Sequence, residues 1–292
     1  MRNYTNGGAT VKAGWWPSAR ARQYLALMKA NTRVLQVANI LAFVAMIVVN
    51  TLATTVGIFG WETGVLSDAI PNLFVPAGLT FSVWGVLYLL VLLFTVYQAR
   101  GLFSADRAAP EALSRVGWLF FVSSAANIAW LLLWHARLVA LSMIPMLVLL
   151  VSLIAVHARL GTGRTRPTGA ERWFFRVPFS AYLGWITVAT VANATAALVT
   201  AGWNGFGLAP EVWAVAMVAV AALLTLVMLL TRRDAAYGLV VLWALAGIAL
   251  KRSADASPAS QAVYVTAVAC AAVVAAAIAA TAIVSALRPL KD

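Results

Sequence analysis

The segment that decides the fold reads Tyr182-Leu183-Gly184-Trp185-Ile186-Thr187-Val188-Ala189-Thr190-Val191-Ala192-Asn193. It lies within an uncharged apolar stretch, residues 177–199, that is long enough to cross a hydrocarbon core of ~30 Å as a helix. On a helical wheel, Tyr182, Trp185, Ala189 and Asn193 fall within about 80° of one another. The segment therefore predicts a membrane-spanning helix with one aromatic and polar face.

Seven further apolar stretches accompany this one. Of the 292 residues, 63% are hydrophobic and only 10% are charged, against about a quarter charged in an ordinary soluble domain. We predict an all-α polytopic membrane helix bundle whose eight transmembrane helices lie near residues 34–56, 77–97, 116–134, 138–156, 177–199, 212–230, 235–250 and 262–287. Residues 1–33 form a basic cytoplasmic or interfacial segment.

The distribution of basic residues predicts the orientation of these helices. Eighteen of the 21 lysines and arginines fall on one side of the predicted layout, and only Arg137, Lys251 and Arg252 fall on the other. Because basic residues near span ends favour the cytoplasm, we expect an integral protein with both termini cytoplasmic, in a bacterial inner membrane. The net charge of +12 then predicts membrane lipids with anionic headgroups as partners. The sequence has no basic stripe interleaved with aromatic residues, so we do not expect it to bind nucleic acid.

The predicted spans lack the ionisable side chains that several classes of membrane protein require. All nine carboxylates and all lysines lie outside the spans or at their edges, which argues against a proton pump, a carboxylate-coupled antiporter or a retinal protein. His135 and His157 sit at opposite ends of the fourth span, roughly 33 Å apart at ~1.5 Å per residue, so they cannot share a metal or haem. The lone Cys270 excludes a disulfide framework. We predict no metal site and no catalytic residues.

Two other spans also carry an aromatic and polar face. The second presents Ala77, Phe81, Trp84 and Tyr88, and the third presents Ser123, Asn127, Trp130 and Trp134. Two interpretations remain open, namely helix packing and an inward cavity that suits a flat, mostly apolar ligand. The tryptophans at span ends are instead typical of an interfacial belt, namely Trp61, Trp118, Trp134, Trp173, Trp203 and Trp213.

The same faces resemble the translocator protein, or tryptophan-rich sensory protein, family (TspO/MBR). Residues 182–193 resemble its P-Y-L-A-W-V-x-F-A-x-x-L-N pattern, and Asn127-x-x-Trp130 resembles its N-x-x-W pattern. Its P-x-W-x-P-P…V-W-x-x-L-Y pattern is matched by Pro71, Pro76, Trp84, Leu87 and Tyr88. The chain departs from the family at Leu73, Val75, Thr80 and Ala181, where the patterns have tryptophan, proline, phenylalanine and proline.

The resemblance implies a five-helix bundle over residues 34–200, with three additional transmembrane helices in residues 201–292 that mark a longer member. It implies a membrane receptor or sensor, often a homodimer, that binds a ligand without a covalent bond. The implied ligands are porphyrins, other tetrapyrroles, haem included, or sterols. The implied ligand-binding residues are Trp84, Tyr88, Asn127, Trp130, Tyr182, Trp185, Ala189 and Asn193. The loop of residues 57–75 would form a lid that carries Trp61, Glu62 and Asp68.

Two other classes of function remain as alternatives. The first is a transporter of a neutral or lipid-like solute, although coupling-ion ligands and inverted repeats are not visible in the sequence. The second is a light- or oxidant-dependent enzyme that modifies a bound pigment. A protein-dependent product under illumination would distinguish that enzyme from a receptor.

Overall fold

The computed structural model describes residues 19–61, 63–102 and 108–287, and side chains from residue 31 onward within these ranges. The described residues form helices joined by loops and contain no strand. Its elements are α1 (Ala19–Thr55), α2 (Thr63–Asp68), η1 (Gly78–Ser82), α3 (Val83–Gln98), α4 (Ala112–Val116), α5 (Leu119–His135), α6 (Val139–Arg159), α7 (Gly169–Glu171), η2 (Arg172–Arg176), α8 (Val177–Thr200), η3 (Gly205–Gly207), α9 (Pro210–Arg232), α10 (Ala235–Ser253) and α11 (Pro258–Leu287).

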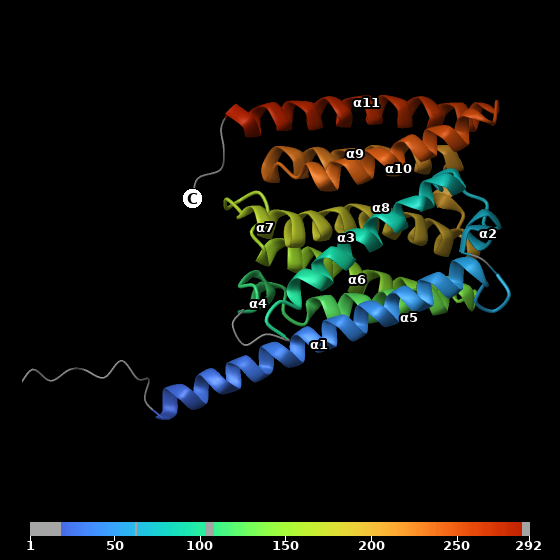
Figure 1. The fold of residues 1–292 in the computed structure, drawn as a ribbon. Coiled ribbons are helices and arrows are strands. Elements are labelled where there is room, and N and C mark those ends of the chain that lie inside the picture. The colour runs from blue at the N-terminus through green and yellow to red at the C-terminus, as the bar shows by residue number, and fades with distance from the viewer. Residues whose placement is uncertain (1–18, 62, 103–107, 288–292) are drawn as a thin grey trace, which may run out of the picture.

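The predicted all-α bundle of about eight membrane-spanning helices is confirmed. Seven helical stretches are long and apolar enough to cross a membrane, and α5 is a shorter apolar helix. The first helix is longer than the predicted span, because α1 runs for 37 residues without a break. At ~1.5 Å per residue it is about 55 Å long, so its N-terminal part projects beyond the bundle (Figure 1).

Helix α8 occupies the centre of the arrangement (Figure 1). It packs against α3 and α6 on the side of the five-helix unit, which is completed by α1 and α5, and against α10 on the other side. Helices α9, α10 and α11 pack on one another and form the three-helix unit. The described chain begins and ends at the same end of the bundle, as an even number of spans requires (Figure 1).

Two glycines let α10 approach the five-helix unit closely. A Cβ added to Gly184 of α8 would lie 2.9 Å from the Tyr237 carbonyl oxygen, and one added to Gly247 of α10 would overlap the side chain of Thr80. Two hydrogen bonds join the same surfaces, from the Ala77 amide to the Gly247 carbonyl oxygen at 3.0 Å and from Trp243 Nε1 to the Thr80 carbonyl oxygen at 2.9 Å. The three added helices are thus an integral part of the fold.

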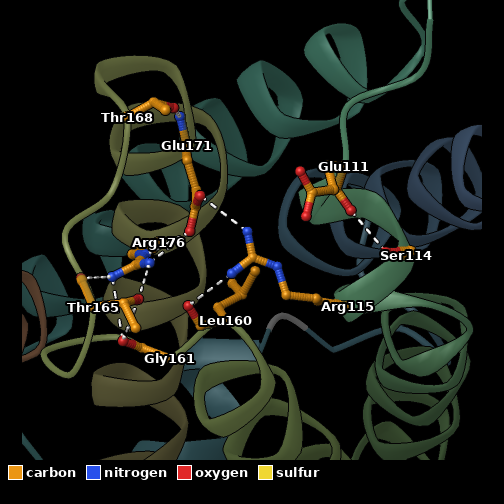
Figure 2. Close-up of polar contacts among 9 residues, drawn as sticks. All are labelled: Glu111, Ser114, Arg115, Leu160, Gly161, Thr165, Thr168, Glu171 and Arg176. Atoms are coloured by element: carbon orange, nitrogen blue, oxygen red, sulfur yellow. Dashed lines mark hydrogen bonds and ion pairs between the residues drawn. The ribbon is translucent and has the colours of Figure 1, made fainter. Parts of the chain in front are cut away.

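Ion pairs fasten the loops at the end of the bundle where α3, α6 and α9 finish, which we call the arginine-rich end. Glu171 lies between Arg115 and Arg176, with N–O distances of 2.9 and 2.7 Å (Figure 2). Arg176 also donates to the carbonyl oxygens of Gly161 and Thr165, at 3.2 and 2.6 Å. Every donor nitrogen of Arg176 therefore has a partner, and this side chain braces the loop that follows α6.

A buried histidine–aspartate pair lies at the same end, and no pattern in the sequence predicted it. His157 Nε2 of α6 lies 2.8 Å from Asp234 Oδ2, and both side chains are almost fully buried. The other oxygen of Asp234 accepts from the Tyr237 amide at 3.2 Å and caps α10. The pair ties the five-helix unit to the start of α10.

We expect Gly247→Ala to reduce the free energy of unfolding by about 1–3 kcal/mol, because the new methyl group collides with Thr80. The matched control is Gly85→Ala in α3, where nothing lies within 4 Å of the added Cβ and the change is expected to be neutral or slightly stabilising. Titration with a denaturing detergent, followed by tryptophan fluorescence, measures both. Equal stability of the two variants would contradict the close contact between α10 and η1.

Candidate ligand-binding site

A small cavity of about 60 Å³ lies beneath α2, between α3, α5 and α8. Its wall is almost entirely apolar and aromatic, with a few neutral polar groups. The residues that line it are Thr63, Ser67, Asn72, Val75, Pro76, Phe81, Trp84, Trp130, Trp134, Trp185, Val188, Ala189, Ala192, Asn193 and Ala196.

Aromatic rings meet edge to face on one side of this cavity. Trp185 of α8 contacts Phe81 and Trp84, with ring centroids 5.9 and 6.0 Å apart and interplanar angles of 86° and 81°. On the opposite side, Trp130 and Trp134 of α5 lie 6.3 Å apart at 32°. Their helical spacing of four residues places both on the same face of α5. The cavity thus lies between two tryptophan pairs.

Asn193 holds α5, α6 and α8 together at the cavity wall. Its side-chain oxygen accepts from Trp130 Nε1 at 3.1 Å and from the Ser142 hydroxyl at 3.2 Å. Buried amides in a membrane interior form such interhelical hydrogen bonds because no water is available. Asn193 is therefore largely satisfied by the protein itself.

Two indole donors at the cavity are not satisfied. Trp134 Nε1 and Trp185 Nε1 are buried and have no hydrogen-bond partner among the residues that the structure describes. Both tryptophans line the cavity. An unpaired buried N–H is costly, so these two donors are available to an acceptor on a ligand.

The structure separates the eight predicted site residues into two groups. Five of them line the cavity, namely Trp84, Trp130, Trp185, Ala189 and Asn193. The other three, Tyr88, Asn127 and Tyr182, do not line it.

These three residues make contacts within the helix bundle. Tyr88 stacks on Trp84 with centroids 5.3 Å apart, and the ring of Tyr182 meets the edge of Trp84 at 6.1 Å. Asn127 accepts a hydrogen bond from Asn50 of α1 at 2.8 Å. As the structure stands, they support the cavity wall from behind.

Two contacts, one near each end of α2, tether the predicted lid. Trp61 is 43% exposed, and the guanidinium of Arg137 lies over its ring, 4.5 Å from the centroid. Asp68 forms an ion pair with Lys251 of α10, with an Nζ–O distance of 2.6 Å. Glu62 lies outside the described residues. Between the tethers, Thr63 and Ser67 of α2 line the cavity, and the Thr63 hydroxyl lies 3.3 Å from His135 Nε2.

One prediction needs correction and several residues were missed. Trp134 was expected in an interfacial belt because it ends its span, but it is only 7% exposed and lines the cavity, since α2 covers that end of α5. Thr63, Ser67 and Asn72 come from a loop without helical periodicity, so no pattern could assign them. Phe81, in contrast, shares the predicted face of the second span.

We expect Asn193→Ala to lower the free energy of unfolding by about 1–3 kcal/mol, because the indole N–H of Trp130 loses its partner in a dry interior. The matched control is Thr190→Val on the same helix, whose hydroxyl bonds only to the Ile186 carbonyl oxygen one turn earlier. Denaturing-detergent titrations of both variants measure the difference. A loss no larger than that of the control would show that Asn193 does not join the three helices.

Comparison with known proteins places this arrangement in a family. The family model described as TSPO-like protein matches residues 36–280. No curated protein and no solved structure matches the chain. The match extends beyond the five-helix unit into α11, so it includes most of the added helices. The chain belongs to the TSPO-like protein family.

Proposed function

We propose that this protein is a membrane receptor for a flat, largely apolar ligand, with a tetrapyrrole such as a porphyrin as the ligand class. One observation carries the proposal: an apolar cavity lies between two tryptophan pairs, and two of these tryptophans keep an unpaired buried N–H. Indole faces stack on planar conjugated systems, and the N–H groups can donate to acceptors on the same ligand. The family membership is consistent with this class.

Ligand binding requires the cavity to open. Its volume of about 60 Å³ is well below the 300–1,000 Å³ typical of small-molecule sites. The lid is the part whose displacement enlarges it, because α2 covers the cavity and is a single short helix of six residues. Two exposed contacts flank it, Trp61 with Arg137 and Asp68 with Lys251, and α2 itself adds the Thr63–His135 contact and the buried Leu66. Displacing the lid also frees two cations at the mouth, where the carboxylates of a porphyrin can bind.

The first test is a titration of the purified, detergent-solubilised protein with protoporphyrin IX and haem, followed by Soret absorption and tryptophan quenching. We expect saturable binding that Trp130→Ala and Trp185→Ala each weaken by an amount on the order of 1–3 kcal/mol, because each removes a stacking surface. The matched control is Trp173→Ala, which removes an exposed tryptophan far from the cavity and should leave the affinity unchanged. Unchanged affinity in both cavity variants, with folding verified, would contradict the proposed site.

A second test concerns the lid alone and needs no ligand. Asp68→Asn removes the ion pair with Lys251, and we expect hydrogen exchange of the α2 amides to accelerate by roughly 1.5- to 5-fold, as the loss of an exposed ion pair worth about 0.2–1 kcal/mol implies. Glu211→Gln serves as control, since Glu211 lies in the first turn of α9 and does not line the cavity beneath α2. Identical exchange in both variants would mean that this tether does not restrain the lid.

A further inference from the structure

A second, larger cavity lies at the arginine-rich end, far from the aromatic one. It encloses about 460 Å³ between the loop after α6, the start of α8 and the turn from α9 to α10. The five-helix unit and the three-helix unit both contribute to its wall. Nothing in the proposed receptor function uses this cavity.

Close packing and hydrogen bonds hold the wall of this cavity in place. Gly163 has a φ of +74° and packs so closely on Arg232 that a Cβ there would overlap the Arg232 carbonyl oxygen. Arg176, which is 5% exposed, holds the neighbouring loop through Glu171, Gly161 and Thr165 (Figure 2). The cavity is therefore a shaped pocket and not a gap between mobile loops.

The charged residues that line the pocket are almost all cationic, namely Arg166, Arg172, Arg176, Arg232, Arg233 and Asp234. Asp234 is already bound to His157 and to the Tyr237 amide, and the charge of Arg176 is balanced by Glu171. Arg172 and Arg232 form no ion pair with a carboxylate among the described residues, and their guanidinium groups give the pocket a positive potential. An anion is the species that such a site favours.

Two buried donors face the pocket without a partner in the described structure. The hydroxyl of Ser180 is unpaired although the residue is only 1% exposed, and Nη1 of Arg232 is buried and unpaired as well. Arg176 ends η2 immediately before α8, and Ser180 follows it by about one helical turn, so the two residues line the same side of the pocket. An anionic oxygen in the pocket would accept from both donors and remove the penalty of leaving them unpaired.

We infer that this pocket binds a phosphate group. Guanidinium groups match the geometry of phosphate oxygens and hydrogen-bond to them in pairs, and basic pockets between membrane helices at the cytoplasmic side receive anionic headgroups. The volume is sufficient for a phosphate with its attached glycerol, and the pocket lies where the helices end. The phosphate can belong to an anionic lipid of the inner leaflet or to a soluble phosphate compound.

The experiment titrates the purified full chain in neutral detergent with three probes: dioctanoyl phosphatidylglycerol, dioctanoyl phosphatidylcholine and inorganic phosphate. Affinity is read from thermal unfolding and from intrinsic fluorescence. We expect saturable binding of phosphatidylglycerol, at least tenfold tighter than that of phosphatidylcholine and weaker at high salt. Binding of inorganic phosphate in its place would support the same site with a soluble source.

The variants locate the site. Arg232→Gln should weaken the bound probe roughly tenfold, because a charge-assisted hydrogen bond is lost. Arg164→Gln is the matched control, since it removes the same charge from the loop after α6, next to Gly163, at a residue that does not line the pocket, and it should change the affinity less than twofold. Equal losses in the two variants, or no preference for an anionic probe, would overturn the inference.

A third variant keeps the inference testable if Arg232→Gln does not fold. Ser180→Ala removes a hydroxyl that bonds to nothing in the described structure, so the probe-free protein should be as stable as the wild type or more stable. Binding of the phosphate probe should nevertheless weaken about three- to fivefold. Unchanged affinity in this variant would contradict a phosphate held by Ser180.

Discussion

The close approach of α10 to the five-helix unit is the contact on which the rest of the structure depends. Gly184 and Gly247 permit it, and the hydrogen bonds from Ala77 and Trp243 fix its register. One end of α10 carries Lys251, which tethers the lid through Asp68, and the other end begins at Asp234 beside the arginine-lined pocket. One helix that a five-helix bundle does not contain therefore reaches both the lid of the aromatic cavity and the wall of the arginine-lined pocket.

This contact also explains two differences from the sequence patterns of the TspO family. Thr80 stands where the pattern has phenylalanine, and Gly184 stands where it has alanine. Both positions lie against α10, where a phenylalanine ring would collide with the Gly247 backbone and an alanine methyl group would press on the Tyr237 carbonyl. Close helix packing in a membrane relies on small residues of this kind. The differences thus follow from the added helices and not from the chemistry of the cavity.

Much of the fold could be predicted because each membrane-spanning segment must match the thickness and the apolar character of the bilayer core. Helical periodicity also found the inward faces, so Trp84, Trp130 and Trp185 were expected at the cavity and are there. Periodicity does not show what a side chain touches across the bundle. Tyr182 shares a face with Trp185 but packs behind Trp84, and His157 pairs with an aspartate 77 residues later. Contacts between distant segments are set by packing, which no local pattern contains.

The hydrogen-bonding groups of the cavity also differ from those that the sequence suggested. The asparagines were the expected polar contacts for a ligand, yet Asn127 lies outside the cavity with its oxygen bonded to Asn50, and Asn193 bonds to Trp130 and Ser142. Breaking those hydrogen bonds so that the asparagines can bind a ligand would cost as much free energy as the new hydrogen bonds contribute. The indole N–H groups of Trp134 and Trp185 have no bond to break within the described structure. Because an indole nitrogen only donates, the proposed receptor would favour flat ligands that present acceptors over those that present only donors.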